Sequence, residues 1–336
     1  THLASSAASD VYKRQQLIPA PAQAAALGSG AAKAGSILKW SGLITLIASF
    51  SGFISAFFGI KAGLAQSRTT REKKHVIVTS ALFITIAVVF IGGMYLLKYL
   101  AQAASSPGTY AVVSQVFVVL FAASYIWLCI VMFKKTQIIR QQERIFNPDA
   151  FTHERDQPNA KQREFISRIR LLGVPLFHFR FGVPEIHDKP IVAWVAGGDR
   201  AYGLLFAWGG IAVAPICVGV VAIGGLGIGA VGIGLLGLGT VAIGAVAFGA
   251  SAIGIKAYAS LSSLGWQCAF SNGFSIAQNA AVGPYAFAEQ VNNETAYKIA
   301  ELALLQQSYL WLLGLIAVGV IVPAVLHWRE VKRRMG

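Results

Sequence analysis

The sequence predicts an integral membrane protein of the α+β class, with three N-terminal transmembrane helices, a β-solenoid and one C-terminal transmembrane helix. Three observations predict this arrangement. Of the 336 residues, 55% are hydrophobic and 12% are charged, about half of the ~25% charged residues of soluble domains. Four uncharged runs are each long enough to cross a bilayer as a helix. A longer uncharged stretch repeats every five residues, and a fixed period of this kind indicates a stacked repeat.

The first 36 residues precede the predicted spans. Residues 4–15 read ASSAASDVYKRQ and resemble translated sequencing-adaptor sequence. We therefore leave residues 1–15 out of the fold prediction and expect a natural N-terminal segment to be missing. Residues 16–36 are rich in Ala, Gly, Pro and Ser, which is typical of a linker.

Residues 37–135 are predicted to form three spans, at 40–60, 76–97 and 110–133. Each run is uncharged and reaches the ~20 residues that a helix needs to cross the hydrocarbon core. The loop between the first two spans is basic. Because basic loops are retained in the cytoplasm, residues 68–74 are predicted to face that side.

Residues 136–200 form a polar linker that ends in the first coil of the predicted solenoid. Within it, residues 161–172 are predicted to form a short basic amphipathic helix, with Phe165, Ile166, Ile169 and Leu172 on one side. Such a helix either lies on anionic headgroups or packs on the next domain. The following PLFHFRFG alternates like a strand, and residues 190–203 are predicted to begin the solenoid.

Eleven five-residue units run without a slip through residues 207–259, and each begins with a small, an apolar and a small residue. A helix repeats every ~3.6 residues and a strand every 2, so neither element explains a period of five. We expect a four-sided β-solenoid with one unit on each side, occupying residues 201–290 and fraying after 260. Residues 291–336 then supply a helix capped by Asn293, a fourth span at 309–326 and a basic tail.

The units resemble the pentapeptide-repeat family, which places a larger apolar residue inside the coil and a small residue two positions earlier. In the matching register, the inward residues are Val231, Leu236, Val241 and Val246, preceded by Gly229, Gly234, Gly239 and Gly244. The outward residues are then Ile223, Ile228, Ile233, Leu238, Ile243 and Phe248, where that family usually carries polar side chains. An apolar exterior must be covered by lipid, by helices or by another chain.

Glycine-rich transmembrane helices are the alternative for the repeat, because residues 201–255 carry no charge and are long enough for two crossings. Charge distribution favours this alternative. If the repeat stays on one side of the membrane, the basic flanks divide almost evenly between the two faces. A single crossing within 201–255 would instead gather most of them on the face that holds residues 61–75.

The sequence predicts no catalytic residue, no cofactor and no metal site. Four potential ligands lie close together in sequence, but they fall on a strand and a polar loop rather than converging: His178, Glu185, His187 and Asp188. The three cysteines, at unrelated spacing, indicate neither a metal cluster nor a disulfide framework: Cys129, Cys217 and Cys268. The glycines of the repeat lack the βαβ context of a nucleotide-binding loop.

The order of parts from about residue 18 onward resembles uncharacterised bacterial membrane proteins with Gly/Ile pentapeptide-like repeats. The shared motifs are an R-x-x-R-E-K-K loop (68–74), PLFHFRFG (175–182), GDRAYGLLFAWGGIAVAPI (198–216) and the five-residue units. In some of these proteins the corresponding part follows a sigma-factor-like DNA-binding region. The resemblance transfers no active site, because its motifs are structural.

These observations favour a non-enzymatic structural or interaction scaffold in the cell inner membrane, crossing it several times. Membrane lipid is the expected partner, with another membrane protein or a second copy of the chain as further candidates, and no nucleic acid is expected to bind the residues present. The alternative is the membrane-bound sensory half of a truncated sigma-factor-like regulator. A transporter ranks third, because the predicted spans carry no charged residue.

We expect the protein to remain in the membrane pellet after extraction with alkaline carbonate, since four uncharged runs of spanning length anchor it. Its release into the soluble fraction would contradict the membrane assignment.

Overall fold

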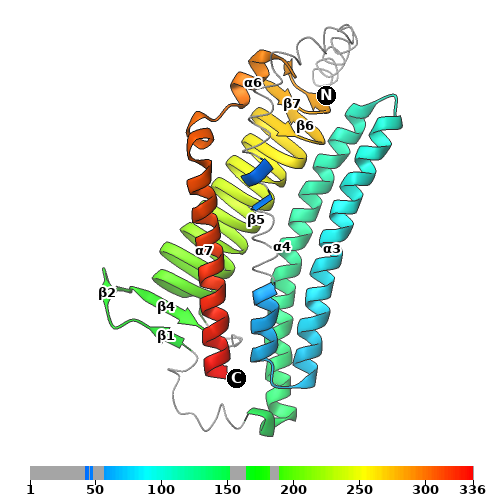
Figure 1. The fold of residues 1–336 in the computed structure, drawn as a ribbon. Coiled ribbons are helices and arrows are strands. Elements are labelled where there is room, and N and C mark those ends of the chain that lie inside the picture. The colour runs from blue at the N-terminus through cyan, green and yellow to red at the C-terminus, as the bar shows by residue number, and fades with distance from the viewer. Residues whose placement is uncertain (1–41, 45, 48–56, 152–163, 182–188, 336) are drawn as a thin grey trace.

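The structure is a computed structural model and describes residues 42–44, 46–47, 57–151, 164–181 and 189–335. It is a mixed α+β fold with three long apolar helices and a mixed sheet (Figure 1). The helices are α3 (Thr70–Ala103), α4 (Pro107–Phe146) and α7 (Ala303–Met335). α3, α4 and the Leu310–Glu330 part of α7 are long and apolar enough to cross a membrane, as expected of a multi-pass membrane protein.

The predicted spans at 76–97, 110–133 and 309–326 all lie within these helices. The predicted span at 40–60 and the linker at 16–36 lie largely or wholly outside the described residues. α3 and α4 pack as a pair, with the rings of Phe90 and Phe121 stacked at 4.0 Å between centroids. Their outward faces expose large apolar side chains, as lipid-facing helices do.

β5 (Ile191–Ser271) is a continuous strand of 81 residues that winds through successive turns (Figure 1). Drawn out straight, it would extend about 270 Å at ~3.3 Å per residue. Because these residues form a strand, the alternative of glycine-rich transmembrane helices is wrong for the repeat.

Three further observations give the number of residues in one turn of β5. A Cβ added to Gly234 would collide with the carbonyl of Gly224, and one added to Gly244 would collide with Gly234.

The rings of Phe248 and Tyr258, also ten residues apart, stack at 4.9 Å. Burial along β5 follows the same ten-residue period. One turn therefore contains two five-residue units, and the expected four units per turn is wrong. The five-residue period is the same in both arrangements, so it did not distinguish between them.

The predicted inward register is also wrong. The positions that face the space between the two sides of a turn are the small residues that open each unit, and all are buried: 207, 212, 217, 222, 227, 232, 237, 242, 247, 252 and 257. They are alanine, cysteine or glycine. A Cβ added to Gly232 would lie 2.7 Å from the carbonyl oxygen of Gly227 and would collide with Leu238. The two sides thus lie too close together for a valine or leucine.

The larger apolar residues point away from this space, and alternate units point in opposite directions. Ile228, Leu238 and Phe248, among the residues of the predicted exterior, are fully buried in a cluster that includes Ile316 and Val320 of α7. Ile223 is exposed, and Ile233 and Ile243 are half-buried. Of the residues predicted to point inward, Val231 and Val241 are buried, whereas Leu236 and Val246 are only half-buried.

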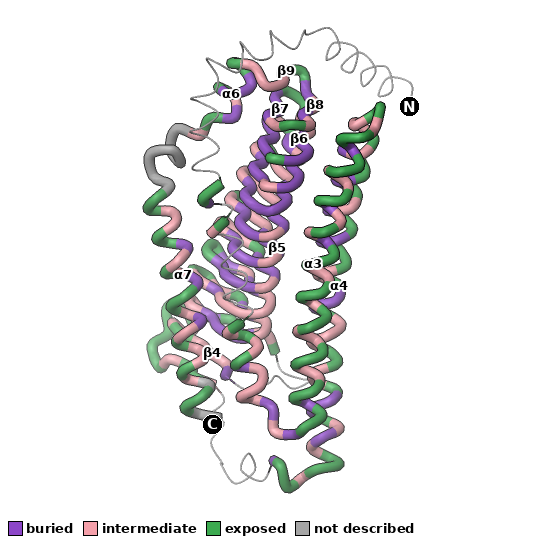
Figure 2. The backbone as a smooth tube through the Cα atoms, turned by 45° about the vertical axis from the view of Figure 1, so that its right-hand side comes forward, coloured by how far each residue is buried: buried purple, intermediate pink, exposed green. Residues whose placement is uncertain are grey.

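The opposite side of β5 packs on α3 and α4. Val241, Ala250 and Leu261 form a cluster with Phe90 and Val118, and Ile243 and Ile253 border it. In both views β5 lies between α7 on one side and the α3–α4 pair on the other (Figures 1 and 2). Burial is concentrated along β5, whereas much of the surface of the helices is exposed (Figure 2). Helices therefore cover part of the apolar exterior that the sequence predicted.

An arm of short strands precedes β5. β1 (Glu164–Ile166) pairs antiparallel with β4 (Phe177–Arg180), and β4 pairs parallel with β5. Between them, β2 (Arg170–Leu171) and β3 (Val174–Pro175) form a small hairpin.

Two predictions concern this arm. The strand expected within 175–182 is confirmed by β4. The helix expected at 161–172 is wrong where the structure describes it, because residues 164–172 form β1, β2 and the start of a turn. The apolar residues there fit a helical spacing, but pairing with β4 decided the conformation. Earlier in the chain, a short 3-10 helix, η1 (Pro148–Phe151), follows the end of α4.

The far end of β5 continues into β6 (Phe274–Ala277), β7 (Ala280–Val282), β8 (Tyr285–Phe287) and β9 (Gln290–Val291). The pairs are parallel, with partners ten to twelve residues apart, such as Ser262 with Phe274 and Phe274 with Tyr285. This agrees with the looser spacing predicted after residue 260. α6 (Glu294–Ala300) begins as expected at Asn293, whose side chain accepts a hydrogen bond from the amide of Ala296.

Replacing Gly239 by alanine should destabilise the protein by ~1–3 kcal/mol, because the added Cβ collides with the carbonyl of Gly229 one turn away. Gly92→Ala is the matched control, since a Cβ at that position in α3 meets nothing within 4 Å. Thermal unfolding in detergent should show a lower midpoint for the first variant only. Equal midpoints would contradict the ten-residue turn.

Candidate functional site

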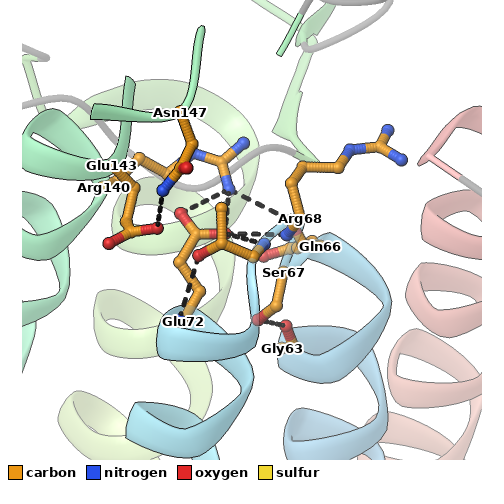
Figure 3. Close-up of polar contacts among 9 residues, drawn as sticks. Gly63, Gln66, Ser67, Arg68, Glu72, Arg140, Glu143 and Asn147 are labelled. Carbon is orange, nitrogen blue, oxygen red and sulfur yellow. Dashed lines mark hydrogen bonds and ion pairs between the residues drawn. The ribbon is translucent and has the colours of Figure 1, made fainter. Parts of the chain in front are cut away.

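Polar side chains gather where α3 begins and α4 ends. We call Gln66, Glu72, Arg140, Glu143 and Asn147 the basal polar cluster (Figure 3). Gln66 belongs to a helical segment, 57–66, that leads into α3. The other four lie on α3, on α4 and directly after α4.

Glu72 has two functions in this cluster. It closes a capping box at the start of α3: its carboxylate accepts the backbone amide of Thr69 at 3.5 Å, while the Thr69 hydroxyl accepts the amide of Glu72 at 3.3 Å. The carboxylate also accepts the backbone amide of Arg68 at 2.7 Å. The same carboxylate accepts two hydrogen bonds from Arg140, at 3.1 and 3.2 Å. One acidic side chain thus caps α3 and ties it to α4.

Arg140 links a third segment to this pair. Its guanidinium donates to the carbonyl of Gln66 at 3.1 Å and lies 5.1 Å from the ring centre of Phe151. The side chains of Arg140 and Glu72 are only 5% and 8% exposed. Removing two charges from water costs free energy, which close pairing and additional hydrogen bonds offset. Such a pair is most sensitive to loss of one partner, because the other charge then stays buried alone.

A second, more exposed pair lies beside the first. Arg71 contacts Glu143 at 3.4 Å with its own side chain 55% exposed. Asn147 donates to the other carboxylate oxygen of Glu143 at 3.0 Å, and its backbone amide bonds to the carbonyl of the same residue. Water screens this outer pair, so it should stabilise the junction less than the buried pair does.

A cavity of about 110 Å³ adjoins the cluster. Its lining combines Glu72 and Arg140 with His75 of α3, Thr136 of α4 and Asp199 of β5. His75 and Thr136 are joined by a hydrogen bond of 3.2 Å. The rest of its lining is largely apolar and includes Val76, Phe133 and Ile139. The cavity lies where both membrane helices meet the start of β5, so the cluster is a junction of several segments.

Buried hydroxyl groups form a second contact at the opposite end of β5. The Gln115 amide of α4 donates to Ser262 at 2.6 Å, and the hydroxyls of Ser114 and Ser262 lie 3.2 Å apart. Ser275 of β6 lies within 3.4 Å of Ser263. The hydrogen bonds from Ser114 and Gln115 hold the far end of β5 at a fixed position along α4.

The potential metal ligands in the sequence do not come together. His178 lies 3.5 Å from Glu164, on neighbouring strands, whereas Glu185, His187 and Asp188 lie outside the described residues. Among the residues that the structure describes, no group of three or more His, Cys, Asp or Glu side chains is placed to hold a metal ion. The three cysteines are buried and unpaired with one another: Cys129, Cys217 and Cys268.

Sequence reasoning did not identify the basal polar cluster. Thr69 and Glu72 have the spacing of a capping box, so that signal was present in the basic loop. In the sequence, Arg140 is one of several basic residues that follow the third predicted span. No local pattern indicates that it reaches back to Glu72, 68 residues earlier.

Comparison of the chain with protein-family models, with curated proteins and with solved structures finds no match.

Replacing Arg140 by glutamine should destabilise the protein by ~3–5 kcal/mol, because the Glu72 carboxylate then stays buried without its cation. The double variant Glu72→Gln/Arg140→Gln removes both charges and should lose less. Arg71→Gln, at an exposed position, should cost ~0–1 kcal/mol. Thermal unfolding in detergent measures all three, and equal losses for the two Arg variants would overturn the importance of the buried pair.

Proposed function

We propose that this protein is a non-enzymatic scaffold of the inner membrane, in which β5 forms a β-solenoid that crosses the bilayer once. The observation that carries the proposal is the position of β5 along α4. The ring of Phe133, the last residue of the third predicted span, lies against Gly210. Ser114, near the start of the same span, bonds to Ser262.

Two independent lengths agree over this interval. Nineteen residues of α4 separate Ser114 from Phe133, which corresponds to ~28 Å at ~1.5 Å per residue. About five ten-residue turns separate Gly210 from Ser262, which corresponds to ~25 Å at ~4.8 Å per turn. Both lengths are close to the ~30 Å of a bilayer hydrocarbon core.

The charges of β5 are placed as a membrane crossing requires. Residues 201–255 carry no charge, whereas Asp199 and Arg200 precede them and Lys256 follows. Lys256 donates at 2.7 Å to the carbonyl of Ile299, at the end of α6. In lipid every backbone amide and carbonyl needs a partner, and pairing between successive turns supplies one.

A crossing by β5 also accounts for the distribution of basic residues. It brings the end of α7 to the same end of the molecule as the start of α3 (Figure 1). Basic residues at that end include Arg71, Lys73, Lys74, Lys134, Lys135, Arg140, Arg329, Lys332 and Arg333. The opposite end carries Lys98, Lys256 and Lys298. The basal end therefore faces the cytoplasm. The charge argument that favoured helices in the repeat is satisfied by one crossing of β5.

Membrane lipid is the partner that this arrangement supports best. Leu205, Leu235 and Ile255 recur at multiples of ten residues and are exposed, so one edge of β5 is covered by neither helix group. Lipid chains would cover this edge, and a second copy or another membrane protein are the further candidates. A rigid β5 with membrane helices on two sides suits a structural or interaction function.

The regulatory alternative meets a geometric difficulty. A DNA-binding region before the predicted span at 40–60 would need to lie in the cytoplasm. With the basal end in the cytoplasm, that span would place the region on the opposite face. We therefore rank a membrane-bound regulator below a scaffold, and a transporter last.

Single cysteines at Lys73 and at Asn279 test the crossing, since both side chains are exposed and lie at opposite ends of β5. The background replaces the three native cysteines by alanine. We expect an impermeant maleimide to label Asn279→Cys in intact spheroplasts and Lys73→Cys only after permeabilisation. Labelling of both in intact spheroplasts, or of neither, would contradict a membrane crossing by β5.

A further inference from the structure

The arm that precedes β5, residues 164–181, carries an apolar tip that is exposed among the described residues. Leu172 is 86% exposed and Ile169 is 66% exposed, and Leu171 beside them is exposed too. A contiguous set of exposed apolar side chains such as this one marks an interaction surface. Arg168 and Arg170 are exposed on the same segment.

The backbone at the tip adds a second observation. Leu172 has φ of 53° and Gly173 has φ of 78°, so both central residues of the β2–β3 turn are left-handed. Turns of this kind favour Asn, Asp or Gly, and a left-handed conformation costs other residues ~1–2 kcal/mol. A leucine there is unfavourable both for the backbone and for its exposed side chain. Strained residues of this kind are concentrated at functional positions.

The arm is held firmly rather than hanging from the sheet. The Trp194 indole of β5 donates to the carbonyl of Leu171 at 3.0 Å. The amide of Leu176 bonds to Ile169, and the amide of Val195 bonds to Leu176. The tip is therefore presented in a fixed position relative to β5.

Contacts of the arm with α7 determine the depth of the arm relative to the proposed membrane. The ring of Phe181 stacks on the imidazole of His327 at 5.6 Å between ring centres. Trp208 of β5 packs edge-on against the same imidazole at 4.5 Å. His327 lies three residues before the end of the Leu310–Glu330 span. The arm thus meets α7 at the basal boundary of the hydrocarbon core.

We propose that the tip of the arm inserts into the cytoplasmic leaflet, with Leu171 and Leu172 among the upper acyl chains and Arg168 and Arg170 on anionic phosphate headgroups. The proposal rests on the membrane crossing described above. Charge complementarity supports it: residues 164–181 contain three arginines and one glutamate, a net charge of +2, and Glu164 is already bonded to Arg180. Basic residues beside apolar ones are the combination that binds anionic interfaces.

The test uses the full chain, without its native cysteines, reconstituted into vesicles of phosphatidylcholine mixed with phosphatidylglycerol, because basic segments bind anionic lipid. A bimane label on Leu172→Cys reports contact with lipids brominated near the top of their acyl chains. Gln141→Cys is the control, on the exposed part of α4 eight residues beyond Phe133. We expect quenching at position 172 to be severalfold stronger than at 141.

Adding Arg168→Gln/Arg170→Gln should reduce quenching at 172 in the anionic vesicles to the level in phosphatidylcholine alone. Weak quenching at 172, equal to that at 141, would overturn insertion. A blue-shifted label that lipid does not quench would indicate a second copy or another protein on the tip, and would also overturn the proposal. Labelling of Lys73→Cys and Asn279→Cys in the same vesicles keeps the two proposals separate, because failure of the arm alone leaves the crossing intact.

Discussion

The narrow space between the two sides of a β5 turn determines the rest of the structure. A Cβ is the largest group that it accepts at most positions, and at Gly227, Gly232 and Gly237 even a Cβ would collide with backbone atoms. The large apolar residues of each unit must therefore point outward. In water this exterior would be unstable, so β5 needs a cover, and α7, α3 and α4 supply part of it. The apolar helices and the repeat thus depend on each other.

A turn of two units explains why helices lie on two sides. Successive units face opposite directions, so one set of apolar residues packs on α7 and the other on α3 and α4. In the proposed crossing the turns stack along the membrane normal and their backbone hydrogen bonds run in the same direction. This satisfies every amide between neighbouring turns without closing a barrel. The buried pair of Glu72 and Arg140 then holds the helices together at the basal end, and the serines near Gln115 hold α4 against β5 at the other end.

The sequence predicted the long apolar helices because their length and apolar composition are local properties. It did not predict the number of units in a turn, since two and four units give the same period of five. A ten-residue pattern was nevertheless present. In one set of alternate units the central apolar residue varies in size, as in Trp208, Ile228, Leu238, Phe248 and Tyr258. In the other set it is isoleucine at 223, 233, 243 and 253.

Long-range pairing accounts for the other differences. Residues 164–172 fit a helix by spacing, but β4 lies next to them in the chain and pairs with β1. The capping box at Thr69 was visible in the sequence, whereas the partner of Glu72 was not, because Arg140 lies on a different helix. The position of the arm relative to α7 depends on its contact with His327, which lies almost 150 residues later in the chain.

Disulfide cross-linking between neighbouring turns tests the central claim most directly. In membranes that contain the cysteine-free variant, the pair Leu235→Cys/Ala245→Cys places two thiols ten residues apart on adjacent turns. Strands in adjacent turns lie ~4.8 Å apart, within the ~4.4–6.8 Å between Cα atoms that a disulfide allows. We expect efficient cross-linking of this pair by copper phenanthroline, and none for Leu235→Cys/Thr240→Cys on opposite sides of a turn. In a membrane helix, residues ten apart are separated by ~15 Å, so failure of the first pair to cross-link would contradict the account.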